Sequence, residues 1–411
     1  MRLSRRLASA LATIGSLCAR AASAQSTDAA TPTLAPVANV SEGTSRSAAR
    51  PDITLSGYVE TFYQWNFNAP SNGITNYRGF DNRHNAVTLS NVVLDATGTL
   101  GPVTAHLALQ FGHTPESYYL GEPSFAGASG AGASNSNVWK FIQQATVAWR
   151  APVGAGLLVE AGIFLSPIGP EGMAVKDQWN WSRSNLFFGL PFYHTGARLS
   201  YPLGDRTTLS LAGYNGWNSV VDNNDEKSVS VALDYVVTDR ITVHALYFGG
   251  VERAAGAPER AGSTPWRSVF DAYVALYPTP WLSLLAHANG GFEPNAFGVS
   301  WWGAGALYAR VRVRPWLFVA ARGDAFYESV PSNASGAASS IFWPSAWVSS
   351  QTLTVDARPH DNVSMRLEYR HDQADGDTYF RGAVSNDATT HAPVANARAQ
   401  DTLTLGMTAW F

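Results

Sequence analysis

The most constraining feature of this sequence is a hydrophobic period of two. In KSVSVALDYVV (227–237), valine, leucine and tyrosine alternate with serine, alanine and aspartate, and NVSMRLEYRH (362–371) and DTLTLGMTAWF (401–411) alternate in the same way. Such alternation predicts β-strands that bury one face. No run of 18 apolar residues follows residue 24, so the pattern excludes helices that cross a membrane.

The first 24 residues predict a secretory signal peptide. A basic start (MRLSRR) leads into an apolar stretch and then into Ala22-Ser23-Ala24, a small-residue cleavage site before Gln25. The only cysteine, Cys18, lies within this segment. A lipoprotein would have a small residue before the cysteine, whereas Leu17 stands there. The mature chain therefore has neither disulfide nor thiol chemistry.

The charge of the mature chain excludes one class of partner. Removing residues 1–24 deletes four arginines and no acids, which takes the net charge from −3 to about −7. We therefore do not expect a nucleic-acid-binding protein. Residues 25–50 are rich in Ala, Ser, Thr and Pro and predict a flexible spacer, so that residues 51–411 form the folded part.

Connections in this folded part alternate between short and long. Short turn signals lie at 100–103, 151–156, 202–206, 237–240, 278–280, 314–315 and 357–362. Longer connections lie near 67–84, 113–137, 166–193, 215–227, 249–267, 290–300, 330–345 and 372–400. Seven short and eight long connections predict about 16 antiparallel strands (14–18). This all-β layout is typical of a closed transmembrane barrel in the outer membrane of a Gram-negative bacterium, with both termini in the periplasm.

Aromatic residues support a membrane barrel, because they gather at both ends of the expected strands. Trp149, Trp281 and Trp316 lie beside short turns, as does Tyr277, while Trp347 lies near a long connection. Two aromatic bands are favoured by the two interfaces of a bilayer, so outer-membrane lipid is an expected partner. A soluble sandwich with bulky strand ends is the alternative.

The last strand ends in phenylalanine, Phe411, which resembles the insertion signal of outer-membrane barrels. We therefore expect the barrel-assembly machinery as a second partner.

A barrel of this size leaves an aqueous channel, so the face opposite the apolar one should be polar. The predicted pore-lining residues are Glu160, Arg198, Asp234, Arg310, Arg322, Asp324, Arg366, Glu368 and Arg370. Arg310, Arg322, Arg366 and Arg370 would form a positive stretch of wall that sets ion selectivity. Alternatively, they pair with acids on the same face, and the two interpretations are compatible.

The connection at 166–194 is unusually long and rich in tryptophan. By our count it joins the fifth and sixth strands. We predict that it folds into the barrel and narrows it, with Phe187 and Phe188 among its anchors; an external loop over the mouth is the alternative. The predicted constriction residues are Glu171, Lys176, Asp177, Trp179, Trp181 and Arg183.

Several stretches also resemble a known family, the OmpL-like outer-membrane β-barrel porins. They are GYVETFYQWNFN (57–68), FDNRHNAVTLSN (80–91), GIFLSPIG (162–169), KDQWNWSRS (176–184), PFYHTG (191–196) and NGWNSVVDNN (215–224). After residue 250 only the rhythm of strands and turns is similar. The resemblance implies a diffusion channel for small solutes and carries over no catalytic residue.

Enzymatic and metal-binding functions find little support in the motifs. The nine histidines show neither H-E-x-x-H nor G-x-S-x-G spacing. His84 and His194 lie at loop–strand junctions, where hydrogen bonding is the simpler role. GASGAGAS (127–134) lacks the lysine of a phosphate-binding loop, and VDNNDE (221–226) is a solvated tip or a calcium site. We predict no catalytic residue, cofactor or metal.

Two further classes stay open. An adhesive or structural barrel, or one with an enzymatic role, would conduct poorly. A transporter for hydrophobic compounds would have an apolar lumen, which the arginines disfavour. A homo-oligomer and a monomer are both compatible with the sequence.

Overall fold

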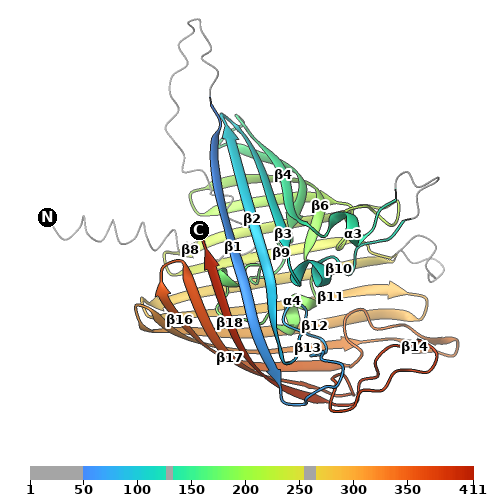
Figure 1. The fold of residues 1–411 in the computed structure, drawn as a ribbon. Coiled ribbons are helices and arrows are strands. Elements are labelled where there is room, and N and C mark those ends of the chain that lie inside the picture. Colours follow the sequence, from blue (N-terminus) through green and yellow to red (C-terminus); the bar gives the residue numbers. More distant parts are fainter. Residues whose placement is uncertain (1–49, 126–132, 254–264) are drawn as a thin grey trace, which may run out of the picture.

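A computed structural model describes residues 50–125, 133–253 and 265–411, in which sixteen antiparallel strands close into a barrel (Figure 1). The strands are β1 (Asp52–Asn66), β2 (Ala86–Leu100), β3 (Val103–Phe111), β4 (Ile142–Ala151), β5 (Leu157–Leu165), β6 (Tyr193–Gly204), β7 (Thr207–Tyr214), β8 (Ser228–Thr238), β9 (Ile241–Val251), β10 (Trp266–Thr279), β11 (Leu282–Asn295), β12 (Gly298–Arg314), β13 (Leu317–Ser329), β16 (Trp347–His360), β17 (Val363–Ala374) and β18 (Ala399–Trp410). The predicted fold class and strand number are confirmed. The predicted signal peptide and almost all of the predicted spacer, up to residue 49, lie outside the described residues.

Short elements occur only in the connections between the described strands. They are α2 (Thr114–Tyr118), α3 (Ser136–Trp139), the 3-10 helix η2 (Val175–Asp177), α4 (Asn185–Phe188) and the small hairpin β14 (Ser332–Asn333) and β15 (Gly336–Ala337). Within the described residues, no helix is long and apolar enough to cross a membrane.

The barrel closes where its first and last strands pair. Tyr58 to Asn66 of β1 lie opposite Trp410 to Thr402 of β18, and every other strand pairs with its neighbours along the chain. Closure leaves no open edge along the paired length, which satisfies the backbone hydrogen-bonding groups within the barrel wall.

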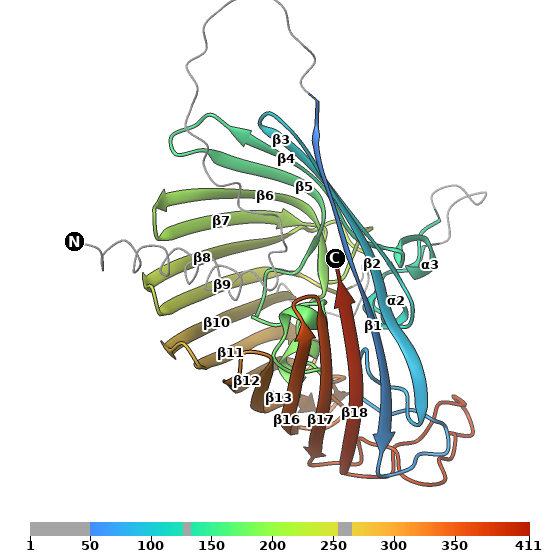
Figure 2. The ribbon, with the colours of Figure 1, turned by 60° about the vertical axis from the view of Figure 1, so that its left-hand side comes forward.

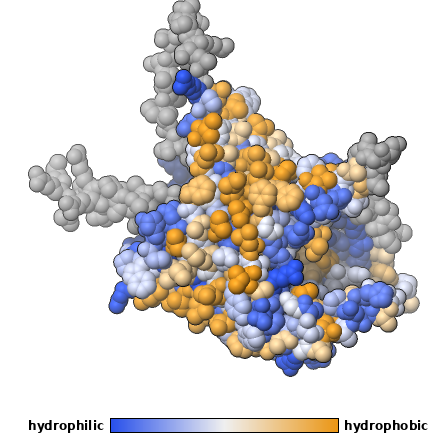
Figure 3. Space-filling view, in the orientation of Figure 1, coloured by the Kyte–Doolittle hydropathy of each residue, from blue (hydrophilic) through white to orange (hydrophobic). Residues whose placement is uncertain are grey.

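Alternation along each strand separates two chemically different faces. On β8, Val229 and Val231 are each 43% exposed, whereas the intervening Ser230 is 5% exposed. The exposed side chains face outward, and Figure 3 shows apolar residues over the outer wall with hydrophilic residues toward its ends. The period of two in the sequence therefore encodes a wall that is apolar outside and polar inside.

The seven predicted short turns are all present, and they lie at the end of the barrel that carries the C-terminus. For example, Trp410 at the end of β18 donates its backbone N–H to the carbonyl of Asn362, which lies in the short turn between β16 and β17. Seven of the eight predicted long connections also lie between strands where they were predicted, although residues 126–132 and 254–264 in two of them lie outside the described residues. Figures 1 and 2 show the longer ones at the opposite end.

The predicted long connection at 290–300 is wrong. Strands β11 and β12 continue through this segment and are joined only by residues 296–297, with Glu293 opposite Ser300. Gly290, Gly291 and Pro294 looked like loop signals. The ladder tolerates them because neighbouring strand residues still pair, and Gly298 adopts the left-handed φ of 154° that a tight turn requires.

One member of the predicted aromatic bands points the wrong way. Tyr277 packs inside the barrel with Leu285 and Tyr308, because it lies on the inward parity of β10. The three tryptophans predicted beside short turns point outward and are about half exposed: Trp149 (49%), Trp281 (53%) and Trp316 (52%).

An arginine introduced on the outer face should destabilise the barrel, whereas an arginine introduced on the inner face should not. Leu307, near the middle of β12, is 69% exposed on the outer face. We expect Leu307→Arg to lower the free energy of unfolding by about 2–4 kcal/mol, because a charge at the membrane midplane loses its hydration. Urea titration in lipid vesicles measures this. Thr97→Arg, on the inner face of β2, is the control and should change the midpoint little; equal losses would contradict the assignment of faces.

Candidate functional site

The connection between β5 and β6, residues 166–192 and here called L3, lies inside the barrel (Figure 2). Its backbone amides donate hydrogen bonds to carboxylates on the inner face of strands from opposite parts of the wall. The pairs are Gly169 with Asp271 on β10 (3.0 Å), Val175 with Glu60 on β1 (2.6 Å), Trp181 with Glu368 on β17 (2.5 Å) and Asn185 with Asp324 on β13 (3.0 Å). L3 therefore crosses the lumen, as predicted, and does not form an external loop over the mouth of the barrel.

Arginines on the same wall bind the carbonyl groups of L3. Arg322 donates to the carbonyl of Ser182 at 2.6 Å, and Arg366 donates to the carbonyls of Gln178 and Asn180 at 2.7 and 2.9 Å. Arg370 donates to Asn185 Oδ1 at 3.1 Å and to a carbonyl of L3. These three arginines are at most 3% exposed.

This arrangement follows from the needs of an irregular segment in a confined space. Most of L3 makes no ladder or helix, so its amides and carbonyls must find other partners when they are buried. Charged wall groups supply those partners, and L3 in turn satisfies charges that would otherwise be costly to cover. Three of the four arginines predicted as positive wall thus lie beneath L3.

L3 is also held by apolar contacts. Trp181 lies against Phe62 of β1, with ring centres 6.0 Å apart, and over Gly406 of β18. A Cβ atom at Gly406 would come within 2.2 Å of the Trp181 ring. Only a glycine leaves room for this ring, so a wall position is shaped to receive L3.

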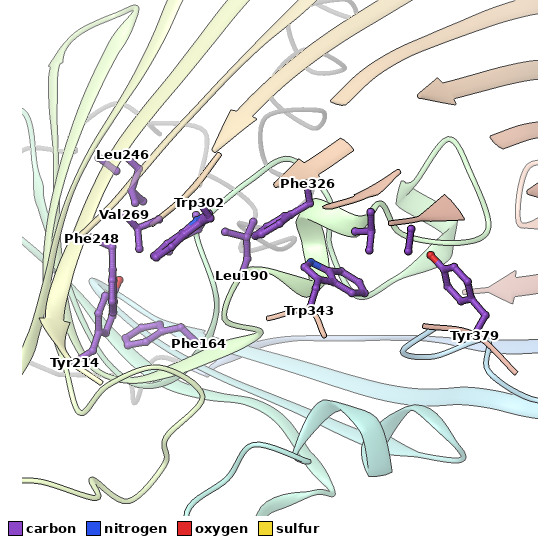
Figure 4. Packing of buried hydrophobic residues seen from close by; sticks show 14 of the residues in the cluster. Phe164, Leu190, Tyr214, Leu246, Phe248, Val269, Trp302, Phe326, Trp343 and Tyr379 are labelled. Carbon is purple, nitrogen blue, oxygen red and sulfur yellow. The ribbon is translucent and has the colours of Figure 1, made fainter. Parts of the chain in front are cut away.

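A second apolar group, the inner aromatic cluster, packs the first and last parts of L3 against the barrel wall. Ile168 and Leu190 of L3 belong to it together with wall residues such as Trp302 and Phe326. Figure 4 shows Leu190 lying between Trp302 and Phe326, with Trp343 from the connection 330–346 close by. This part of the lumen is therefore filled by side chains.

The predicted constriction residues divide into two groups. Glu171, Trp181 and Arg183 are buried: the Glu171 carboxylate accepts from the backbone N–H of Ser184, which caps α4, and Arg183 donates to carbonyls of L3 itself. Lys176, Asp177 and Trp179 are more exposed, with Lys176 and Asp177 paired at 3.0 Å. The first group builds L3 and the second presents polar and aromatic surface to the lumen.

The connection 67–85, here called L1, also folds inward, which the sequence analysis missed. The ring of its Phe80 packs against those of Phe187 and Phe192, with ring centres 5.9 and 5.6 Å apart. Its Arg78 binds the carboxylate of Asp81 and lies 3.4 Å from Asp372 of β17. The mixture of aromatic and charged residues in FDNRHN was the available signal, since L3 carries the same mixture.

Electrostatics stabilise this turn of L1. Burial alone would raise the pKa of the Asp81 carboxyl, but the guanidinium groups of Arg78, Arg370 and Arg183 hold that pKa below its usual range. Asp81 is therefore a charged partner within the lumen at neutral pH.

The remaining predicted pore-lining residues make local pairs. Arg198 lies 2.7 Å from Glu160 on the neighbouring strand, and His244 lies 2.8 Å from Asp234. Arg310 is 3.9 Å from Asp356, which sequence reasoning passed over. Glu60, Asp271 and Arg358 were passed over too, although the alternation of β1, β10 and β16 could have assigned them to the inner face.

The two histidines singled out by sequence hold the chain in place. His84 Nδ1 accepts the backbone N–H of Asn66, and His194 uses Nδ1 for the carbonyl of Gly216 and Nε2 for the Ser166 hydroxyl. In 221–226, the Asp222 carboxylate contacts Lys227. Among the described residues, no group of three or more His, Cys, Asp and Glu side chains is placed to hold a metal ion. Most of 127–134 lies outside the described residues.

Filling the space at Gly406 should release L3. We expect Gly406→Val to displace Trp181 and to make Lys176 and Arg183 accessible, because the new methyl groups occupy the position of the indole ring. Trypsin digestion of the folded protein, read by mass spectrometry, checks for cleavage at these two positions.

Gly98→Val is the matched control, since a Cβ at this strand position meets no atom within 4 Å. An uncut L3 in both variants would show that Trp181 does not depend on Gly406.

Comparison with solved structures shows a shared fold. Over 89% of this chain and 99% of the other, the barrel is similar to the outer membrane channel DcaP of Acinetobacter baumannii, with a TM-score of 0.56 and 11% identity. It is similar to OmpT of Vibrio cholerae over 89% and 99%, with a TM-score of 0.52 and 10% identity. It is also similar to an anion-selective porin from Comamonas acidovorans over 88% of this chain and 100% of the other, with a TM-score of 0.53 and 12% identity.

Comparison of sequences gives a family. Residues 52–411 match the family described as "Putative beta-barrel porin-2, OmpL-like". The sequence has no significant match among curated proteins.

Proposed function

The chain belongs to the OmpL-like β-barrel porin family of the outer membrane, and we propose that it lets small hydrophilic solutes and ions diffuse passively through a polar lumen narrowed by residues 166–194. The observation that carries this proposal is the position of L3, which four carboxylates and three arginines of the inner wall hold across the lumen. A segment held at so many points gives the passage a fixed width.

The inner surface that L3 leaves open is polar. The side chains of Asp234 and Asp177 are each 44% exposed, and those of Arg198 and Lys176 are 19% and 18% exposed. Groups of both signs face water on the inner wall and on L3. A lumen of this kind favours hydrated solutes over hydrophobic ones.

The surroundings of the channel follow from its orientation. We place both termini in the periplasm, after removal of residues 1–24, because the short turns of outer-membrane barrels lie on that side. Phe411 then offers the barrel-assembly machinery a terminal aromatic residue, and the apolar outer wall contacts outer-membrane lipid. A trimer form is named for OmpT of Vibrio cholerae, and a homo-oligomer is our proposal here too.

Removing the centre of L3 should widen the channel. We expect deletion of residues 171–186 to raise the single-channel conductance by roughly twofold or more, because this segment occupies the lumen. Planar-bilayer recording measures the conductance, and the heat-dependent shift on a gel establishes that the variant is folded.

The control deletion removes residues 385–393, an exposed tip of the connection 375–398. It should leave the conductance unchanged. A folded 171–186 deletion that conducts like the intact protein would rule out the constriction, and folded intact protein that shows no open steps would rule out the channel.

A further inference from the structure

Between L3 and the short turns, the inner wall carries more arginines than acids. Arg310 and Arg312 of β12, Arg358 of β16 and Arg366 of β17 share one stretch of inner face with a single carboxylate, Asp356. Arg310 and Arg312 approach the turn at 315–316, and Arg358 approaches the turn at 361–362. This stretch therefore lies between L3 and the periplasmic end.

The single carboxylate is shared among several donors. Asp356 lies 2.9 Å from Arg358, 3.6 Å from Arg366 and 3.9 Å from Arg310. It also accepts a hydrogen bond from the Ser364 hydroxyl at 2.7 Å. One negative charge among these guanidinium groups leaves the stretch with a net positive charge.

Three acids of the inner wall and of L3 are engaged elsewhere. Glu368, one inward position above Arg366, accepts from the amides of Trp181 and Ser182 and from the Thr354 hydroxyl. Glu60 accepts from the Val175 amide, and Asp177 pairs with Lys176. L3 thus uses the acids that would otherwise neutralise the wall.

The arginines differ in whether their N–H groups are already used. Arg366 points up to L3 and is 1% exposed. Arg310 and Arg358 instead lie over the Phe318 ring, 4.0 and 5.3 Å from its centre, and their side chains are 18% and 23% exposed. Arg358 uses its Nε for Asp356. A guanidinium group that lies over an aromatic ring keeps the in-plane donors that are not already paired for another acceptor. Arg312, opposite Phe318 in the ladder, is exposed.

We propose that Arg310, Arg312 and Arg358 form an anion-binding patch on the periplasmic side of L3, so that the channel favours small solutes with a carboxylate or phosphate group. The inference rests on the proposed porin function and adds its solute class. Planar guanidinium groups held beside each other match the oxygen geometry of these anions, and charge beside a narrow passage decides which ions enter it.

The test compares ion selectivity in planar bilayers under a KCl gradient. The intact protein should pass chloride in preference to potassium. In the variant Arg310→Gln/Arg312→Gln/Arg358→Gln, we expect the ratio of chloride to potassium permeability to fall by about fivefold, since unit charges close to the path of the ions are lost. Open steps should remain, because these side chains make no hydrogen bond with L3 in the described structure.

Arg240→Gln is the matched control. Arg240 lies in the exposed turn between β8 and β9 and donates to the carbonyl of Pro278, so its substitution removes one positive charge at the same end of the barrel, as Arg312→Gln does. It should leave the permeability ratio unchanged. The single variant Arg312→Gln, at an exposed position, provides a smaller shift if the triple variant does not fold. Inorganic phosphate added to the intact protein should reduce the chloride current.

The outcomes separate this inference from the function on which it rests. Normal open steps with the same permeability ratio in the intact protein and the arginine variants would overturn the anion patch and leave the porin intact. An equal shift in Arg240→Gln would assign the selectivity to general surface charge and overturn the patch as well. Absence of open steps from folded intact protein would overturn both proposals.

Discussion

The lumen of this barrel depends on one kind of interaction, a buried carboxylate that accepts hydrogen bonds from the backbone amides of an irregular segment. Glu368 binds two successive amides of L3, and Glu328 of β13 binds the amides of Ile341, Phe342 and Trp343 in the connection 330–346. Hydrogen bonds to a charged acceptor are stronger than neutral ones, and they are strongest where water is excluded. Because the acids stand on rigid strands, they convert loops without regular structure into parts of a fixed interior.

The same interaction explains why the wall carries both signs of charge. L3 presents amides and carbonyls together, so it needs acids and arginines on the facing strands. Arg322 and Asp324 lie on alternate positions of β13 and bind L3 through opposite chemistry, one to the carbonyl of Ser182 and the other to the amide of Asn185. Most of the charged residues that the sequence predicts as pore lining instead bind L3. Arg310 and Arg358, nearer the short turns, are not bound to L3, and their side chains are 18% and 23% exposed.

The strands could be predicted from the sequence because their signal is local. A period of two with punctuating turns gives the strand number, and it fails only at 290–300, where glycines and a proline inside a hairpin imitate a loop. The inward location of L3 could also be anticipated, because Trp179 and Trp181 stand among charges. Its partners could not: Trp181 and Glu368 are 187 residues apart, and Val175 and Glu60 are 115 apart. Alternation assigns Arg310 and Arg322 equally to the inner face, and only the path of L3 distinguishes an exposed arginine from a covered one.

The place where Trp181 docks has a consequence for assembly. Its indole ring touches Phe62 of the first strand and Gly406 of the last, while its amide is bound by Glu368 of the strand before the last. These surfaces come together only when β1 and β18 have paired, so this docking site does not exist in an open sheet. L3 therefore completes its folding after the barrel has closed, and once in place it acts as an internal staple across the seam. Opening the seam then requires the loss of these contacts as well as the β1–β18 ladder, which adds to the barrier against unfolding.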